Sequence, residues 1–228
     1  MIGIIGAMDE EIELLERNMN VANKVEAAGT LFIEGVLKGK DVVLLKSGIG
    51  KVNAAMATTM LHERYDIDMV INTGSAGGFA DELEVGDVVI SSLVTHHDVD
   101  VTAFDYEYGQ VPGMPPMYKA DDRLMTNAID AVAGTKAKAA RGIIATGDSF
   151  MQDETRVKFV QDKFPDMIAA EMEAAAIAQV CYKYNTPFVV IRALSDIAGK
   201  ESEISFEQFL PLAAENAAIM IMAMVDSL

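Results

Sequence analysis

Residues 168 to 180 read Ile-Ala-Ala-Glu-Met-Glu-Ala-Ala-Ala-Ile-Ala-Gln-Val, an almost wholly apolar run that contains two carboxylates, Glu171 and Glu173. The pattern predicts a strand at residues 167–172 followed directly by a helix at residues 174–184. Glu173 would then lie in the first helical turn, where the helix dipole and free N–H groups favour an ionised acid. Glu171 is given the simpler interpretation of a solvated or structural charge.

The same alternation of short apolar runs with longer periodic segments extends across the chain and predicts an α/β fold with a largely buried sheet. Residues 31–36 and 42–45 flank Gly39-Lys40 as in a hairpin, so we expect a mixed sheet. No linker-like segment divides the 228 residues, which predicts a single domain over residues 1–228. Further strands are expected at residues 2–5, 42–47, 69–73, 88–91, 141–145 and 188–193, and further helices at residues 10–19, 52–64, 155–164 and 206–225.

Charge and composition restrict the ligand. The chain has 35 Asp and Glu against 18 Lys and Arg, a net charge of −17, so nucleic acid and anionic membrane surfaces would be repelled. A single cysteine, Cys181, excludes an internal disulfide, and three histidines without metal-site spacing argue against zinc. We find no basic leader and no apolar run of the ~18 residues that a membrane span needs. We therefore expect a cytoplasmic protein that binds a small neutral or cationic molecule.

Small and polar residues gather where the predicted strands end. In open α/β sheets, ligands bind outside the carboxyl ends of the strands, so these segments are expected to form one site. The segments are residues 6–11, 47–50, 72–78, 146–150, 171–173 and 192–196.

Several of these segments admit more than one interpretation. Residues 3–8 superficially resemble a dinucleotide fingerprint, but acids follow directly and would repel a pyrophosphate. Glu11 can be an ordinary acid of a helix N-terminus or a catalytic group. Arg192 either pairs with Asp196, which would keep Asp196 ionised, or pairs with Glu173 or Glu11, which would leave Asp196 able to carry a proton near neutral pH.

Residues 101–117 form a loop with three aromatic residues, three prolines and two glycines, too apolar to lie freely in water. It is expected to pack on a ligand, on a partner subunit or on the domain itself. His96 and His97, just before it, are interpreted as structural or solvated rather than as metal ligands.

Six ordered blocks together resemble the bacterial 5′-methylthioadenosine/S-adenosylhomocysteine nucleosidases of the nucleoside phosphorylase and nucleosidase superfamily. They span nearly the whole chain with the same intervening lengths as in the family: residues 3–8 with Glu11, 47–53, 72–77, 146–150, 170–174 and 192–196. The resemblance implies a three-layer α/β/α sandwich with a mixed central sheet and a homodimer. It also implies hydrolysis of the N-glycosidic bond that joins adenine to a 5′-thio-substituted ribose, with no cofactor and no metal.

By the same resemblance, Asp196 protonates adenine N7, Glu11 activates water and Glu173 holds the ribose hydroxyls. Such acids suit the reaction, because breaking a glycosidic bond requires a protonated leaving group, an activated water and negative charge near the cationic sugar. The resemblance gives substrate-binding roles to Ser75 and Arg192 at the water, Met172 at the ribose, Phe150 and the backbone of Met151 at adenine, and Ala7, Ile49, Ser195 and Phe206 in the walls.

The family's pocket is closed by a loop of the second subunit, and the matching residues here are Val101, Phe104, Tyr106 and Pro112. Asp9 stands where a glutamate is more usual and Met151 where a smaller branched residue is common, and neither departure touches a catalytic side chain. The apolar pocket would accept methylthioadenosine, S-adenosylhomocysteine and 5′-deoxyadenosine. Methionine salvage, relief of product inhibition and supply of a signal precursor all stay open as cellular roles.

Two other functions compete with hydrolysis. A purine nucleoside phosphorylase of the same fold would use phosphate, which prefers arginines or lysines beside the glycine-rich loops, whereas this chain has Glu11 there. A nucleoside-binding protein without catalysis would need the pocket but not the three acids.

Overall fold

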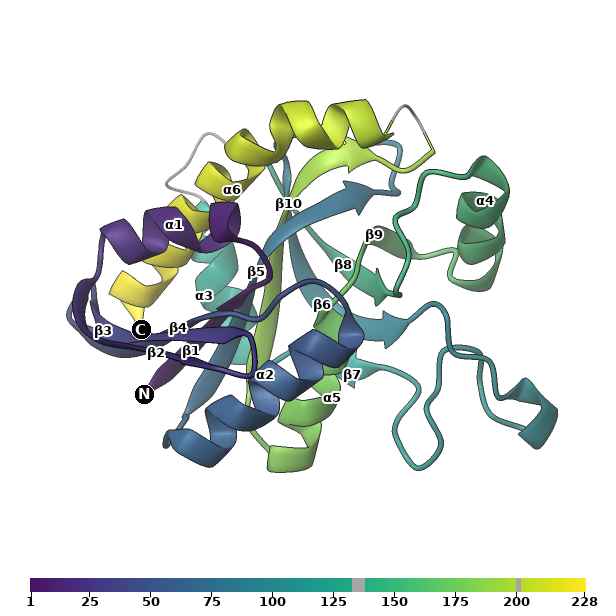
Figure 1. The fold of residues 1–228 in the computed structure, drawn as a ribbon. Helices are drawn as coiled ribbons and strands as arrows, with labels where there is room; N and C mark the ends of the chain where they lie inside the picture. Colours follow the sequence, from purple (N-terminus) through teal and green to yellow (C-terminus); the bar gives the residue numbers. More distant parts are fainter. Residues whose placement is uncertain (133–137, 200–201) are drawn as a thin grey trace.

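The computed structural model describes residues 1–132, 138–199 and 202–228, and folds them into alternating strands and helices (Figure 1). The strands are β1 (Ile2–Gly6), β2 (Asn20–Ala27), β3 (Thr30–Leu37), β4 (Lys40–Lys46), β5 (Met69–Gly78), β6 (Val88–His96), β7 (Tyr118–Lys119), β8 (Ala139–Thr146), β9 (Met167–Glu171) and β10 (Phe188–Ile197). The helices are α1 (Asp9–Arg17), α2 (Lys51–Arg64), α3 (Asp122–Val132), α4 (Glu154–Lys163), α5 (Ala174–Tyr184) and α6 (Ser202–Ser227), with a short 3-10 helix η1 (Thr102–Phe104).

The strands form one mixed sheet that partly closes on itself. β5 pairs in parallel with β1 and β10, and its end pairs antiparallel with β9. β10 pairs with β6, β6 with β8, and β8 with β9, so five strands form a ring of pairings. β1, β4, β3 and β2 extend the sheet from β5, and β3 and β4 are the predicted hairpin. The predicted α/β class with a mixed sheet is confirmed.

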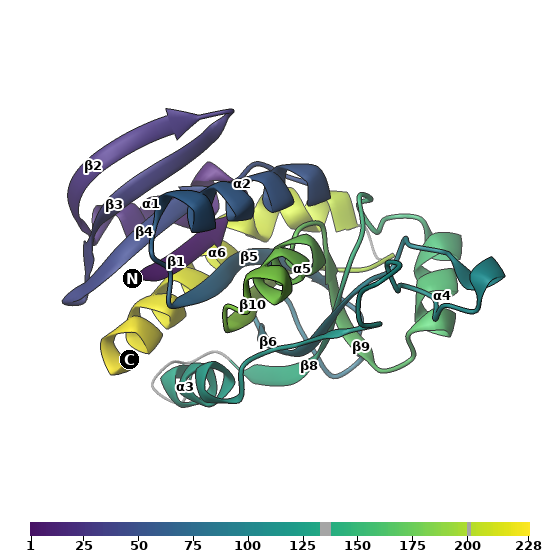
Figure 2. The same cartoon turned by 90° about the horizontal axis from the view of Figure 1, so that it is seen from below.

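Helices cover both faces of this sheet. Helices α1, α3 and α6 lie on one side, and α2 and α5 on the other (Figures 1 and 2). Each side has its own hydrophobic core: Leu15 of α1, Leu124 of α3 and Ile221 of α6 belong to one, and Leu61 of α2 and Ile177 of α5 to the other. Burial of these apolar side chains is the main favourable contribution to folding.

The sequence patterns missed two major elements and underestimated the length of several strands, most of all three of them. β2 is an edge strand with mostly exposed, polar side chains, so it lacks the apolar alternation that marks a strand. Helix α3 was not predicted although its buried residues are spaced on one face. Strands β5, β6 and β10 continue to Gly78, His96 and Ile197, through small or polar residues that resemble turns when read without their neighbours.

Helix α6 corrects one prediction. Within Ser205–Ser227, the most apolar 18-residue window has a mean hydropathy of 1.5, so by length and composition alone this helix could cross a membrane, and the expectation that no such run exists does not hold. In the fold, 44% of the most apolar 18-residue window is buried. Ala217, Ile221 and Met224 pack in the same core as Ile12 and Leu15 of α1, which accounts for their apolar character within this fold.

Candidate active site

A cavity of about 420 Å³ opens where strands β1, β5, β9 and β10 end, and it is large enough for a small-molecule ligand. Gly77 of β5 pairs with Ala170 of β9, so the carboxyl ends of these two antiparallel strands meet at the cavity. The cavity is lined by all twelve site residues predicted for this chain alone: Ala7, Glu11, Ile49, Ser75, Phe150, Met151, Met172, Glu173, Arg192, Ser195, Asp196 and Phe206.

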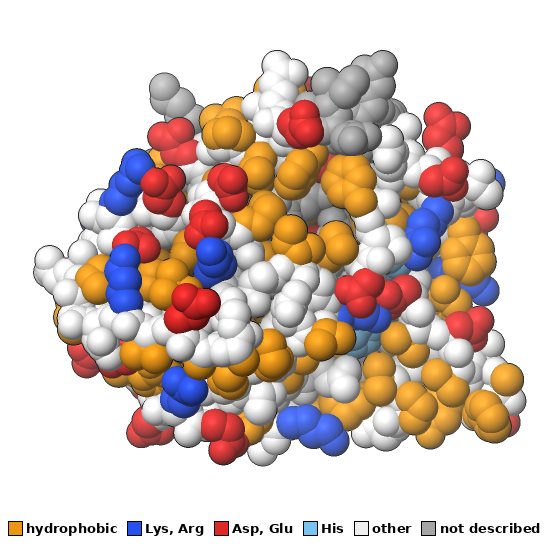
Figure 3. All heavy atoms as spheres, in the orientation of Figure 1, with side chains coloured by type: hydrophobic (Ala, Val, Ile, Leu, Met, Phe, Trp, Pro, Cys, Tyr) orange, Lys and Arg blue, Asp and Glu red, His pale blue; other side chains and the backbone are white. Residues whose placement is uncertain are grey.

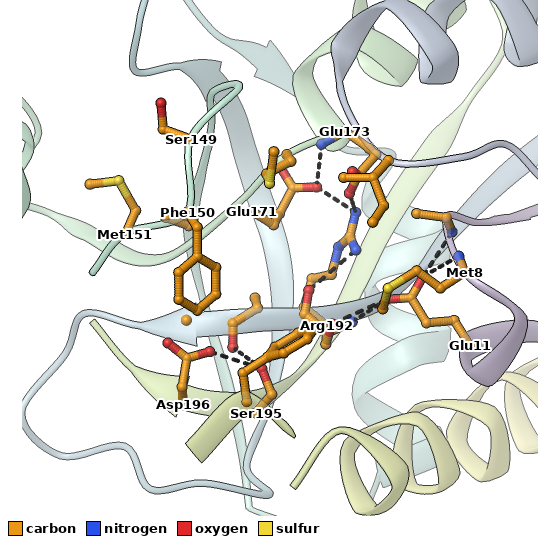
Figure 4. Close-up of a pocket in the computed structure, with 18 of the residues that line it drawn as sticks. Met8, Glu11, Ser149, Phe150, Met151, Glu171, Glu173, Arg192, Ser195 and Asp196 are labelled. Atoms are coloured by element: carbon orange, nitrogen blue, oxygen red, sulfur yellow. Dashed lines mark hydrogen bonds and ion pairs between the residues drawn. The ribbon is translucent and has the colours of Figure 1, made fainter. Parts of the chain in front are cut away.

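Glu11 is a buried acid held at one end of the cavity (Figure 4). It lies in the first turn of α1, and its Oε2 accepts the backbone N–H of Ala7 at 2.7 Å and of Met8 at 3.3 Å. Its Oε1 accepts the backbone N–H of Ser75 at 2.9 Å and the Ser75 hydroxyl at 3.1 Å. The carboxyl group is therefore held in one orientation by the segment that follows β1 and by β5.

Arg192 is fully buried behind the cavity and decides how the neighbouring acids are paired. Its Nη2 forms an ion pair with Glu171 Oε2 and a longer one, at 3.5 Å, with Glu173 Oε2. The same nitrogen donates to Asn72 Oδ1 at 2.8 Å, and Nη1 donates to the carbonyl oxygen of Ser75 at 3.3 Å. Burial works to lower the pKa of Arg192, but the nearby carboxylates of Glu171, Glu173 and Glu11 raise it overall.

Glu171 is buried, with only 7% of its surface exposed, so its interpretation as a solvated charge was wrong. The alternative left open with it, a structural role, agrees with the ion pair to Arg192. Of the two alternatives weighed for Arg192, the pairing with Glu173 is present at 3.5 Å. Neither alternative included Glu171, because the pattern of residues in β10 does not reveal which distant carboxylates its side chain meets.

Glu173 is the N-cap residue of α5, but its carboxyl group does not bind the end of that helix. Its Oε1 instead accepts the backbone N–H of Gly50 at 2.9 Å. Burial, followed by the charge of Glu171, raises the pKa of Glu173 to about 8, against the lowering effects of Arg192 and the Gly50 N–H. The N–H groups of Glu173 and Ala174 at the start of α5 donate to Glu171 instead, so the expectation that they stabilise the charge of Glu173 was wrong.

Asp196 lies at the other end of the cavity, opposite the Glu11 end, and beside Phe150 in Figure 4. The Ser195 hydroxyl donates to Asp196 Oδ1 at 2.9 Å. The pairing of β10 with β5 shifts register between Leu194 and Asp196, so strict alternation ends there and both Ser195 and Asp196 line the cavity. The rings of Phe150 and Phe206 meet edge to face with centroids 5.8 Å apart, which gives this end an aromatic wall.

The four residues assigned to a partner subunit lie away from the lining of this cavity. Phe104, in η1, is 74% exposed, an unusual position for a large aromatic side chain. Hydrophobic side chains also gather in Figure 3 around the end of the molecule where this loop lies in Figure 1.

His96 and His97 are buried rather than solvated. His96 Nε2 contacts Gln179 Oε1 at 3.1 Å, and burial lowers the pKa of both histidines. Within residues 1–132, 138–199 and 202–228, no group of three or more His, Cys, Asp or Glu side chains could hold a metal ion.

Several lining residues were given no individual role in the sequence analysis: Met8, Ala76, Gly77, Ser149, Gln152, Ala170, Glu171 and Glu207. Five of them, Met8, Ala76, Gly77, Ser149 and Glu171, lie inside the segments expected to form the site, and Gln152 and Ala170 adjoin Met151 and Glu171. Glu207 follows Phe206 at the start of α6 and carries no comparable signal of its own.

A family model of the phosphorylase superfamily matches residues 1–226. A 5′-methylthioadenosine/S-adenosylhomocysteine nucleosidase of Oceanobacillus iheyensis is 62% identical over 227 residues, covering 100% of this chain and 99% of its own. The crystal structure of such a nucleosidase from Neisseria meningitidis, in complex with methylthio-immucillin-A, has a TM-score of 0.97 at 48% identity, covering 100% of this chain and 99% of its own. The structure of the Colwellia psychrerythraea enzyme in complex with adenine has a TM-score of 0.96 at 50% identity, and the match covers 98% of this chain and 93% of its own.

The fold and the match over residues 1–226 define a member of the phosphorylase superfamily. Identity of about 60% over full length narrows this assignment. The chain belongs to the 5′-methylthioadenosine/S-adenosylhomocysteine nucleosidase family, and the resemblance stated from the six sequence blocks is confirmed.

A substitution at Gly74 tests how tightly the side chains are packed at the Glu11 end of the cavity. A Cβ at Gly74 would lie 2.3 Å from Arg192 Nη1 and 2.6 Å from Glu11 Oε1, so Gly74→Ala must displace both charged groups. We expect it to lower the free energy of unfolding by about 2–4 kcal/mol in urea titrations. Gly39→Ala is the matched control. Gly39 also has a positive φ, +77°, but no atom lies within 4 Å of its Cβ position. This variant should lower the free energy of unfolding by about 1 kcal/mol. If both variants lowered the free energy of unfolding by the same amount, the close packing around Gly74 would be contradicted.

The raised pKa of Glu173 predicts a pH-dependent stability. Between its unfolded value of 4.5 and about 8, Glu173 holds a proton in the folded protein but loses it on unfolding, so its contribution to stability is lost as pH rises. The unfolding free energy of the wild type, relative to Glu173→Gln, should fall by up to about 1.4 kcal/mol per pH unit across this window. Urea unfolding followed by circular dichroism from pH 5 to 8.5 measures the difference, and a constant difference would refute the shift.

Proposed function

We propose that this chain hydrolyses the N-glycosidic bond of 5′-methylthioadenosine and S-adenosylhomocysteine, and of 5′-deoxyadenosine, releasing adenine and the corresponding sugar. The observation that carries the proposal is a single cavity that places Glu11 and Glu173 at one end and Asp196 with two aromatic rings at the other. Ligands of relatives support it, since the Colwellia psychrerythraea enzyme was solved with adenine. We also propose that residues 1–228 act as one domain, in the cytoplasm, and without a cofactor.

In this proposal the Asp196 end receives adenine. Phe150 and Phe206 would contact the faces of the purine, and the backbone of Met151 would read its edge. Asp196 would donate a proton to adenine N7, which makes adenine a better leaving group as the glycosidic bond lengthens. Ser195, whose hydroxyl already donates to Asp196 Oδ1, would hold the carboxyl group in orientation.

The Glu11 end would receive the water and the ribose. Glu11, fixed by three backbone N–H groups and one hydroxyl, would accept a proton from the attacking water, while Ser75 and Arg192 help to order it. Glu173 would hold the ribose hydroxyls, with Met172 packed against the sugar and Ala7 and Ile49 in the walls. As positive charge develops on the ribose, it would favour the ionised form of Glu173.

Water is preferred to phosphate as the nucleophile because of the charges at this end. Arg192 is the only cationic side chain among the described residues that line the cavity, and its charge is already paired with Glu171. An incoming phosphate would meet the Glu11 carboxyl group without a free cation to offset the repulsion.

We further propose that the chain works as a homodimer in which Val101, Phe104, Tyr106 and Pro112 of one copy close the sugar end of the other copy's cavity. The support is the 74% exposure of Phe104 in an apolar loop that lies outside its own cavity. Burial against a second copy would remove this apolar surface from water. Among the cellular roles that stay open, this substrate range suits methionine salvage.

Loss of either acid should abolish most of the activity. We expect Asp196→Asn to lower kcat by about 10²–10⁴-fold, as for one acid–base group, and Glu11→Gln to reduce turnover nearly to background while nucleoside binding survives. Adenine release from each of the three nucleosides, with and without phosphate, measures this. Normal turnover in either variant would remove that residue from the mechanism, and a rate that requires phosphate would replace hydrolysis with phosphorolysis.

The shared site can be tested by mixing two defective chains. On its own, the Phe104→Ala protein should have a lower kcat/KM for 5′-methylthioadenosine than wild type. The Asp196→Asn protein on its own should be nearly inactive. A hybrid dimer formed by co-refolding would contain one intact site, in which the acids come from the Phe104→Ala chain and the loop with Phe104 comes from the Asp196→Asn chain. Such hybrids should therefore regain activity. Ile129→Ala, at a 41% exposed position on α3, is the control for Phe104→Ala and should behave as wild type. Mixtures no more active than the sum of their parts would argue against a shared site.

A further inference from the structure

Glu171 is a buried carboxylate for which the proposed reaction has no direct use, yet it has more polar partners than Glu173. Its Oε2 accepts the backbone N–H of Glu173 at 2.9 Å and of Ala174 at 2.8 Å, and also pairs with Arg192 Nη2. Its Oε1 accepts the hydroxyl of Thr146. A buried charge is tolerated only when it is paired and hydrogen-bonded in this way.

The bonds to backbone N–H groups fix the first turn of α5. Glu171 stands two residues before the N-cap and places a negative charge at the positive end of the helix dipole. Thr146 strengthens the attachment, because its hydroxyl donates to Glu171 while accepting the N–H of Ala175 at 2.8 Å. The backbone from which the Glu173 side chain projects is thus tied to β8 and β9.

The ion pair with Arg192 also determines what remains for Glu173. Arg192 Nη2 is occupied by Glu171 and by Asn72, and its contact with Glu173 is long, at 3.5 Å. Figure 4 shows the Glu173 carboxyl group beside the guanidinium. Its Oε1 accepts the Gly50 N–H at 2.9 Å, and the residue lines the cavity. Without the charge of Glu171, the guanidinium would have Glu173 as its nearest remaining ion-pair partner.

We propose that Glu171 is a positioning residue: by holding Arg192 and the first turn of α5, it keeps the Glu173 carboxyl group free to bind the ribose hydroxyls. This inference rests on the proposed role of Glu173 at the sugar. Removing the negative charge of Glu171 would let Glu173 close onto Arg192 and lose its contact with the ribose.

The charged groups that face Glu173 come from three elements: Glu171 on β9, Arg192 on β10 and Glu11 on α1. The backbone N–H of Gly50, just before α2, is an uncharged hydrogen-bond donor to the same carboxyl group. Glu171 and Glu11 raise the pKa of Glu173, and Arg192 lowers it. Taking away the Glu171 charge therefore lowers the pKa of Glu173.

The test compares Glu171→Gln with wild type on 5′-methylthioadenosine and on its 2′-deoxy analogue, which lacks a hydroxyl that Glu173 would hold. We expect kcat/KM for the ribonucleoside to fall about 10- to 100-fold and the preference for it over the analogue to shrink by a similar factor, as in Glu173→Gln. Adenine affinity should stay within about twofold, because the Asp196 end is untouched. Glu13→Gln, at an exposed position on α1, is the matched control and should match wild type.

A general structural defect would lower activity on both nucleosides equally and leave their ratio unchanged, and that result would overturn the proposal. Should Glu171→Gln fail to fold, Thr146→Val loosens the same carboxylate while keeping its charge, and it should shift the ratio in the same direction. A wild-type ratio in Thr146→Val would then count against the proposal.

Direct titration separates this inference from the proposed function. In protein labelled with carboxyl-¹³C glutamate, the Glu173 signal, assigned by its loss in Glu173→Gln, should titrate at lower pH in Glu171→Gln than in wild type. A wild type that releases no adenine would refute the proposed function, while an unchanged Glu173 titration would refute the role of Glu171 whether or not the enzyme is active.

Discussion

The arrangement of this site depends on one buried cation. Arg192 lies within β10 with almost no exposed surface, and taking a guanidinium out of water is tolerated only when carboxylates and carbonyl oxygens replace the solvent. Here the replacements come from β5, β9 and the start of α5: Asn72, Ser75, Glu171 and Glu173. Because those segments are far apart in sequence, the charge can be satisfied only when the strand ends have met in their final positions.

The same network gives two neighbouring glutamates different environments. Glu171 receives the cation and the helix N–H groups, whereas Glu173 receives one N–H and faces the cavity with a raised pKa. Two carboxyl groups two residues apart are thus separated into a structural charge and a group whose protonation can respond to a ligand. The division is electrostatic and follows from the turn of the backbone between β9 and α5.

Much of the site could be predicted because its residues sit at strand ends. The segments around Glu11, Ser75, Glu173 and Asp196 each follow an apolar run, and the topology brings such ends together. Pairing was harder to predict: nothing near Arg192 in the sequence indicates that its partner is Glu171, twenty-one residues earlier, rather than Asp196 four residues later. The polar edge strand β2 and the closure of the sheet through β9 also escaped, because the first lacks an apolar pattern and the second depends on long-range pairing.

Strand β2 also has a consequence for how the protein behaves in concentrated solution. An outer strand offers unpaired N–H and C=O groups to any other extended chain, and this is a common start of aggregation. Here that border carries Lys24 and Glu26, and its pairing with β3 is interrupted by a bulge between Val21 and Asn23. Charge and local twist therefore discourage strands of other molecules from adding to this edge of the sheet.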